Sequence, residues 1–231
     1  MLIHPWDAAL DDDEWRTWLA DGHDFGQLVV NGLPGQPPVV IPTHFSVEDA
    51  PTGTVLLVHL ARPNPVWKNI AADPHVVITV VDDYAYIPTT WRAKAGGPDE
   101  DGVPTSYYAA VQLRCRAEIV DDPDEKADLL ARQLAHFQPA GDHPAVAVGA
   151  PPYGRMLPGI RGLRLHVDEV AAKFKYDDSN PAAHRAEAAD RLQQRATGRD
   201  LGAATQQRRR LGRIGTWRPR TAPSRPTGRG R

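Results

Sequence analysis

Apolar and polar residues alternate most clearly over residues 106–120. One face carries apolar side chains two residues apart, at Tyr107, Ala109, Val111, Leu113, Cys115, Ala117 and Ile119. The other face carries Gln112, Arg114, Arg116 and Glu118. A period of two is typical of an antiparallel strand with one buried face. A second alternating strand is predicted around 163–168, and apolar runs bounded by Gly and Pro predict strands at 26–31, 38–47, 54–62 and 75–83.

Helical spacing of apolar residues predicts two amphipathic helices. The first lies near 12–20, where three acids precede tryptophan and leucine at helical intervals. The second covers 123–137, with Asp122 as its cap and Pro123 at its first position. Its buried stripe is Leu129, Leu130, Leu134 and Phe137. Further helices are predicted at 65–72, with Asn64 as the cap, and at 181–196, and a long loop rich in Pro and Gly at 138–158.

This succession of elements predicts a mostly β protein with peripheral helices, an α+β fold. Six or seven short strands separated by turns, with three or four helices, are typical of a small β-barrel. No glycine-rich phosphate motif follows a strand, which argues against a Rossmann or Walker nucleotide site.

The overall charge of -2 hides a strong asymmetry. The segment from Gly198 onward holds ten arginines and one acid, Asp200, a net charge of +9, so the remainder carries -11. We therefore predict a folded domain over 1–197 and a basic tail over 198–231, because such a composition cannot build a core. The tail can bind nucleic acid, pair with acidic protein surface or act as a solubilising extension, and the last two functions are favoured.

Composition excludes several other classes. The single cysteine, Cys115, rules out an intrachain disulfide framework and a multi-cysteine metal site. No apolar run is long enough to span a bilayer, and the acidic N-terminus lacks the order of a signal peptide. A cytoplasmic protein is expected. Cys115 lies on the apolar face of its strand and is therefore expected to be a core residue.

His59 is the first candidate for cofactor chemistry. It shares one face of a predicted strand with Val55, Leu57 and Ala61. An imidazole among apolar residues suits an axial haem ligand, although the strand alone fits a core histidine better. The following stretch adds Arg62, Asn64 and Lys68 near the end of the strand. Cations and helix N-terminal amides bind phosphates and carboxylates, so either an FMN phosphate or haem propionates would fit there.

Three more segments carry candidate side chains. Tyr84, Tyr86 and Trp91 surround a proline and can line a flat cofactor or form a packed aromatic cluster. The hydroxyls of Thr105, Ser106, Tyr107 and Tyr108 can orient a polar substrate or cap loop backbone. Lys173 and Lys175 alternate with aromatic residues and can neutralise an anion, although such a run is most often a solvated face.

The chain resembles the PaiB-like family, described as FMN-binding negative transcriptional regulators. The matching stretches are Pro42-Thr43-His44-Phe45, His59–Lys68, Ala85–Trp91, Val103–Tyr108, and Ile160–Leu163 leading to Lys173–Lys175. The resemblance covers roughly residues 1–192. It implies a split β-barrel related to the flavin reductases and pyridoxamine-phosphate oxidases, usually dimeric, with a cofactor site at the dimer interface.

Departures from the regulator pattern make the chain similar to the piperazate synthase branch of that family. Lys175 is followed by Tyr-Asp-Asp-Ser-Asn, and residues 92–102 form an atypical insertion. The branch binds haem b and cyclises δ-N-hydroxy-L-ornithine to L-piperazic acid. The resemblance implies that His59 ligates the iron, that cofactor contacts come from Arg62, Asn64, Lys68, Trp91 and Lys173, and that substrate binding and proton transfer fall to Tyr86, Thr105, Tyr107, Tyr108 and Lys175.

The alternatives are an FMN-binding transcriptional regulator and a flavin-dependent oxidoreductase on the same barrel. A homodimer acting on a small amino acid is expected, without a membrane. No helix-turn-helix pattern is visible, so nucleic acid is not an expected partner.

Overall fold

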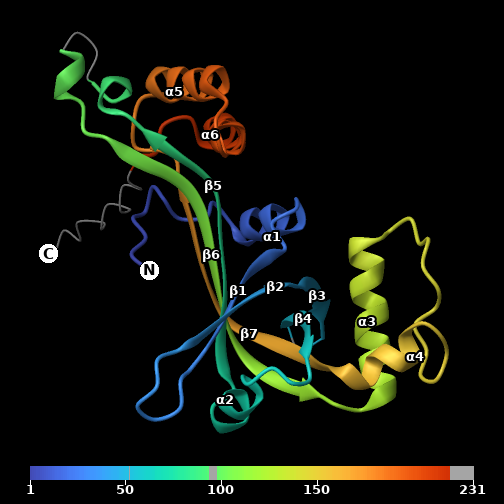
Figure 1. Cartoon of the computed structure of the whole chain (residues 1–231). Coiled ribbons are helices and arrows are strands. Elements are labelled where there is room, and N and C mark those ends of the chain that lie inside the picture. Colours follow the sequence, from blue (N-terminus) through green and yellow to red (C-terminus); the bar gives the residue numbers. More distant parts are fainter. Residues whose placement is uncertain (52, 94–97, 219–231) are drawn as a thin grey trace, which may run out of the picture. The chain divides into compact units, whose positions relative to one another are not determined.

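The computed structural model describes residues 1–51, 53–93 and 98–218, and its contacts divide the chain into two compact units (Figure 1). The first unit comprises Met1, Ala9–Asp82 and Ala109–Lys173. The second comprises Leu2–Ala8, Asp83–Tyr108 and the chain from Phe174 onward. The division therefore differs from a simple boundary at residue 197, because three long strands contribute residues to both units.

Seven strands of the described chain form one sheet in the order β2-β1-β5-β6-β7-β4-β3. They are β1 (Phe25–Val30), β2 (Val39–His44), β3 (Ser46–Ala50), β4 (Gly53–Ala61), β5 (His75–Ile87), β6 (Thr105–Val120) and β7 (Ile160–Lys175). Strand β1 pairs antiparallel with β2 and β5, and β4 pairs antiparallel with β3 and β7. The alternating residues 106–120 form most of β6, as predicted from their period of two.

Helices α1 and α3 begin where their acidic caps predict. The helices of the described chain follow in sequence order. They are α1 (Asp12–Ala20), α2 (Trp67–Ala72), α3 (Pro123–Phe137), α4 (Tyr153–Met156), α5 (Ala182–Arg195) and α6 (Asp200–Ile214), with short 3-10 turns at Thr89–Trp91, Asp99–Asp101 and Leu157–Gly159. The Asp11 and Asp122 carboxylates accept the first backbone N–H groups of α1 and α3. Among the residues that the structure describes, no helix is long and apolar enough to cross a membrane.

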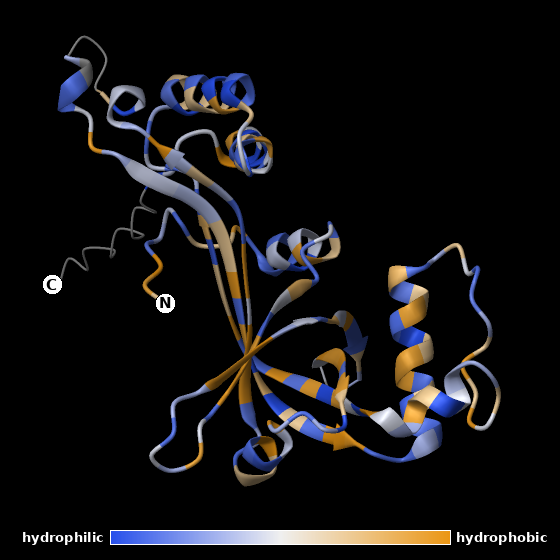
Figure 2. Cartoon of the chain, viewed as in Figure 1, coloured by the Kyte–Doolittle hydropathy of each residue, from blue (hydrophilic) through white to orange (hydrophobic). Residues whose placement is uncertain are grey.

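The core of the first unit lies between β4 and α3. Val55 and Leu57 of β4 pack with Val120 and Leu129. Bands of alternating hydropathy along β6 and β7 mark the buried positions (Figure 2). Gly162 of β7 lies opposite His59 in the β4–β7 ladder. A Cβ atom at Gly162 would lie 2.9 Å from Leu129 Cδ1, so glycine lets α3 approach the sheet closely.

Two predicted elements are corrected in the first unit. The strand expected over 38–47 is two strands that meet at Phe45, because β2 pairs with β1 whereas β3 pairs with β4. Phe45 itself is fully buried where the chain changes partners. The helix expected over 65–72 begins at Trp67, and Asn64 instead closes the preceding turn by accepting the N–H of Val66.

The predicted basic tail is partly a folded element of the second unit. Residues 200–214 form α6, which packs beside α5 (orange and red in Figure 1). Helix α6 buries Ala203, Ala204 and Arg210, so the expectation that this segment cannot build a core is wrong for the helix. Asp200, the one acid, accepts hydrogen bonds from Arg195 and Thr197 at the start of α6. Residues 219–231 lie outside the described part of the chain.

A buried ion triad links the two helices of the second unit to the end of β7. The Asp178 carboxylate accepts from the Arg185 guanidinium at 2.6 Å and from Arg210 Nε at 2.7 Å. Asp178 and Arg185 are fully buried, and Arg210 is 1% exposed. The Asp178 carboxylate thus contacts two buried arginines and ties both α5 and α6 to residue 178.

Candidate functional site

A cavity of about 470 Å³ opens beside His59 in the first unit. Its wall is contributed by β1, β2, β4 and α3 and by the residue before β1: Asp24, Phe25, His44, His59, Leu130, Gln133, Leu134 and Phe137. The volume falls in the range of roughly 300–1,000 Å³ that is typical of small-molecule sites. Two imidazoles and one amide are set among aromatic and aliphatic side chains, which is the composition expected of a cofactor pocket with few oriented polar groups.

The hydrogen bonds of Gln133 fix the tautomer of His59. Gln133 Nε2 donates to the carbonyl of Leu57 at 2.9 Å, so the amide oxygen is the atom that faces His59. That oxygen lies 2.7 Å from His59 Nδ1. Because an amide oxygen can only accept, Nδ1 carries the proton, and in the neutral form of the ring the lone pair lies on Nε2. Among the described residues, no hydrogen bond engages Nε2, so this nitrogen is left for a ligand.

His44 lies next to His59 and is the second imidazole of the cavity. The two rings meet edge to face with 5.3 Å between centroids, and His44 also meets Phe137 edge to face at 5.0 Å. Burial lowers the pKa of His44 below 6.5, the His59 imidazole lowers it further, and Asp24 opposes them. His44 is therefore a neutral imidazole at neutral pH.

A short polar contact joins the end of α3 to the residue before β1, beside the cavity. His136 Nε2 at the end of α3 lies 2.7 Å from the carboxylate of Asp24, just before β1. The His136 ring also meets Phe137 edge to face at 4.6 Å. These contacts tie the C-terminal turn of α3 to the sheet, and they hold Phe137 in the cavity wall.

Stability is expected to fall below pH 6.5 through His44. The folded-state pKa of His44 is lowered, so the unfolded chain binds this proton more readily, and the contribution of His44 is lost as pH falls through the lowered pKa. Replacing His44 with Phe keeps an aromatic ring against Phe137 and removes the titration. Urea unfolding from pH 7.5 to 5.0 should give a shallower decline for H44F than for the parent protein. Parallel curves would contradict this assignment.

The predicted cofactor residues of the first unit lie outside the His59 cavity. Arg62 lines a different pocket, Asn64 closes a turn, and Lys68 is exposed on α2. Lys173 is buried on β7. The three predicted strand neighbours of His59 also differ in burial. Val55 and Leu57 are core residues, whereas Ala61 is exposed. His59 therefore lines a cavity that contains none of these predicted companions.

The second unit gathers three of the predicted substrate residues. Lys175 Nζ donates to Thr105 Oγ1 at 2.7 Å and lies 5.9 Å from the centre of the Tyr108 ring. Tyr107 is fully buried, and its hydroxyl donates to the Asp177 carboxylate at 2.8 Å. Burial raises the pKa of Tyr107 to about 12, so this hydroxyl is a poor proton donor or acceptor near neutral pH.

The aromatic residues of the second unit are packed by arginine. The Arg195 guanidinium carbon lies 4.7 Å from the centre of the Trp91 ring, and Arg195 also donates to the carbonyl of Tyr86. The Tyr86 side chain is half exposed. Stacking on arginine accounts for the position of Trp91 without a flat cofactor.

Cys115 is a core residue, as predicted. It is 2% exposed, and burial raises the pKa of its thiol to about 12, so the thiol stays protonated. It does not offer a thiolate for iron.

Gln133 and His44 are the site residues that the sequence analysis did not identify. Gln133 left a signal, because it is a polar residue four positions from both Leu129 and Phe137, within the predicted buried stripe of α3. A buried amide at such a position requires hydrogen-bond partners. His44 lay within one of the family-like stretches but showed no metal-ligand spacing, since its neighbour His59 is on another strand.

Residues 1–169 match the family model described as "Putative FMN-binding domain". The chain belongs to this PaiB-like family. It is 28% identical over 119 residues to the protease synthase and sporulation protein PAI 2 of Bacillus subtilis (strain 168). That match covers 51% of the chain and 54% of the relative, so the chain spans about half the length of the curated relative it matches.

Solved structures share the fold at low identity. The FAD and heme binding protein from Mycobacterium smegmatis gives a TM-score of 0.56 at 15% identity, over 97% of this chain and 93% of that one. The flavocytochrome Anf3 from Azotobacter vinelandii gives a TM-score of 0.53 at 19% identity, over 74% of this chain and 70% of that one. A 5-nitroimidazole antibiotic resistance protein from Bacteroides thetaiotaomicron VPI-5482 gives 0.54 at 16%, over 72% and 85%. The fold is the split β-barrel with peripheral helices that the sequence predicted.

Proposed function

We propose that this PaiB-like protein is a haem-dependent enzyme that converts δ-N-hydroxy-L-ornithine to L-piperazic acid and water. The observation that carries the proposal is the hydrogen bond from His59 Nδ1 to Gln133 Oε1, which leaves Nε2 as the ring nitrogen available to a ligand at the cavity. A histidine held in this way by a second residue is the usual arrangement of a metal-ligating imidazole.

The residues of the cavity fit haem. Phe25, Leu130, Leu134 and Phe137 supply apolar surface for a macrocycle, and His59 supplies the nitrogen ligand. Two structures that share the fold are named for a flavin together with haem or a cytochrome, the FAD and heme binding protein of Mycobacterium smegmatis and the flavocytochrome of Azotobacter vinelandii. An uncharged nitrogen ligand has no comparable use in binding a flavin, which favours haem over FMN at this cavity.

The proposed reaction forms one N–N bond and breaks one N–O bond. The α-amine attacks the δ-nitrogen, the hydroxyl group leaves as water with a proton released by the amine, and there is no net redox change. When bound, haem supplies a Lewis-acidic iron that weakens the N–O bond. The protein must hold the extended chain of the substrate in a ring-like conformation, since prepaid ring-closure entropy can lower the barrier substantially.

The chain offers distinct groups for binding the substrate and for proton transfer. Lys175, which donates to Thr105 in the second unit, is our candidate for the substrate carboxylate on the strength of the family resemblance. The hydroxyls of Tyr108 and Tyr86 are candidates for moving the proton of the α-ammonium. Tyr107 is not among them, because its hydroxyl is buried and donates to Asp177. We further propose that the working form is a homodimer.

Turnover without any redox partner tests the proposed activity. Haem-loaded protein incubated with δ-N-hydroxy-L-ornithine in the absence of NADH, flavin and other reductants should yield L-piperazic acid, detected by mass spectrometry. The K175M variant should keep its haem and bind the substrate more weakly, by about tenfold in KM or more, because a charge-assisted contact is lost. Absence of product from protein with a full complement of haem would refute the proposed activity. It would not refute haem binding, which the absorption of the same protein measures independently.

Gln133 is expected to set the affinity for haem. Replacing Gln133 with Leu removes the acceptor that orients the His59 ring, and losses of about 10- to 100-fold in affinity are typical for such supporting residues. Titration with hemin, followed by absorption, measures the change. R132Q is the matched control, because Arg132 lies on the same helix and pairs with Glu48 outside the cavity. Equal affinities of Q133L and R132Q would remove the proposed role of Gln133.

FMN binding is the second candidate function, and the description of the family model favours it. A flavin-binding protein would take up FMN in preference to hemin and would show no cyclisation of the hydroxylated amino acid. Competition between the two cofactors for the purified protein separates the candidates.

A further inference from the structure

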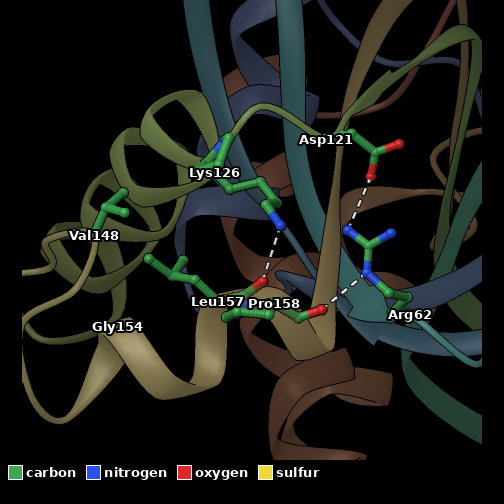
Figure 3. A pocket seen from close by; sticks show the side chains of 8 residues that line it. Arg62, Asp121, Lys126, Val148, Gly154, Leu157 and Pro158 are labelled. Atoms are coloured by element: carbon green, nitrogen blue, oxygen red, sulfur yellow. Dashed lines mark hydrogen bonds and ion pairs between the residues drawn. The ribbon is translucent and has the colours of Figure 1, made fainter.

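A second pocket of the first unit holds an excess of positive charge (Figure 3). It has a volume of about 320 Å³ and lies between the N-terminal half of α3, the loop before β7 and the residue that follows β4. Arg62 and Lys126 reach it from two sides, and Asp121 lies at its edge. No residue that lines it also lines the His59 cavity.

Lys126 brings a buried ammonium to this pocket. The residue is 3% exposed, and Nζ donates to the carbonyls of Leu157 at 2.9 Å and Ile160 at 3.3 Å. Both acceptors are neutral, and no carboxylate among the described residues forms an ion pair with Lys126. Asp121 and Asp122 act on this charge only from a distance, so burial of the ammonium stays costly and an anion in the pocket would lower that cost.

Arg62 adds a second cation with hydrogen-bonding capacity to spare. Its Nε donates to the carbonyl of Pro158 at 2.8 Å, and one terminal nitrogen lies 3.3 Å from Asp121. Asp121 is already held through both of its oxygens by Arg161. Asp121 is therefore shared between Arg62 and Arg161, and nearly half of the Arg62 side chain is exposed.

The opposite wall of the pocket is apolar. Val148 and Leu157 line it, and Gly154 packs against the backbone of Gly149. A Cβ atom at Gly154 would lie 2.6 Å from the backbone of Gly149, so the fold of this loop requires glycine there. The pocket thus pairs two cationic donors with apolar surface, as in sites that bind small acids.

We propose that the Arg62–Lys126 pocket binds a small oxyanion, either the carboxylate of an organic acid or a phosphate group. Arg62 provides the exposed donor, and Lys126 provides the buried charge. Arg161 keeps Asp121 engaged, which limits its repulsion of the ligand. The proposal concerns a site apart from the His59 cavity and does not depend on the function proposed for that cavity.

Calorimetric titration of the full-length protein with sodium phosphate and, separately, sodium acetate tests this site at constant ionic strength in chloride. We expect saturable binding of at least one anion, and the better ligand distinguishes a phosphate site from a carboxylate site. R62A should weaken that binding at least tenfold, because one charge-assisted hydrogen bond is lost. K68A is the matched control, since Lys68 is exposed on α2 and lies outside the pocket.

Two outcomes overturn the proposal. One is no saturable binding of either anion by the parent protein. The other is equal affinity in R62A and K68A. Because Arg62 is partly exposed, R62A is expected to fold, and its circular dichroism spectrum and melting temperature check this. If R62A loses hemin binding while neither anion binds the parent protein, Arg62 belongs to the cofactor site, and the separate oxyanion site is wrong.

Discussion

Replacing His59 with alanine is expected to abolish the Soret band of the haem-loaded protein. His59 is the histidine whose free ring nitrogen borders the 470 Å³ cavity, and the hydrogen bond to Gln133 directs that nitrogen away from the amide. Without the imidazole, the cavity keeps its apolar walls but loses the iron ligand. Haem content, measured by absorption after reconstitution and gel filtration, should fall from stoichiometric to background.

A second histidine provides the matched control for this result. His166 of β7 belongs to the same unit and pairs with Glu118 outside the cavity, so H166A should keep its haem. A cavity variant, H59G, should regain a Soret band when imidazole is added to the buffer. An H59A protein with the haem content of H166A would show that another residue ligates the iron.

Replacing Asp178 with asparagine is expected to destabilise the protein by about 3–5 kcal/mol. The carboxylate offsets Arg185 and Arg210, which are both almost fully buried, and asparagine in its place withdraws that negative charge from two desolvated guanidinium groups. Because these arginines lie on α5 and α6, the loss should loosen the helical part of the second unit. Urea unfolding followed by tryptophan fluorescence measures the change.

An exposed ion pair between the same two helices provides the control variant for that experiment. Asp190 pairs with Arg208, and both side chains are largely exposed, so D190N should cost less than about 1 kcal/mol. If D178N and D190N unfold at the same urea concentration, the triad does not stabilise the second unit.

Local patterns predicted most elements of the fold because each element buries one face. The stripe of α3 and the alternation of β6 follow from period and caps alone, and both elements appear within a residue of their predicted bounds. The break at Phe45 could not be found in this way. An alternating run gives no sign of where a strand exchanges one pairing partner for another, and β2 and β3 are adjacent in the chain but at opposite edges of the sheet.

Helix α6 shows how composition can mislead. Its arginines suggested a solvated tail, yet Ala203, Ala204, Gln207 and Arg210 fall on one helical face and are buried. Arg210 is tolerated inside because its Nε donates to the Asp178 carboxylate. Asp178 lies 32 positions earlier in the chain. A charge pair of that separation leaves no local signal.

The site was predicted only in part, for the same reason. His59 stood out because it is a polar residue in an apolar strand, whereas Gln133, 74 positions away, becomes its partner only when α3 packs on β4. Arg62 was correctly recognised as a cation near the strand end, but the turn after β4 directs it toward Lys126 rather than toward the His59 cavity.

The central claim, that the His59 cavity is a haem site, is tested most directly by titrating the purified apo-protein with hemin and with FMN. We predict saturation at one hemin per chain with a Soret band that FMN does not displace. Saturation by FMN with a flavin spectrum, and no Soret band from hemin, would contradict the account.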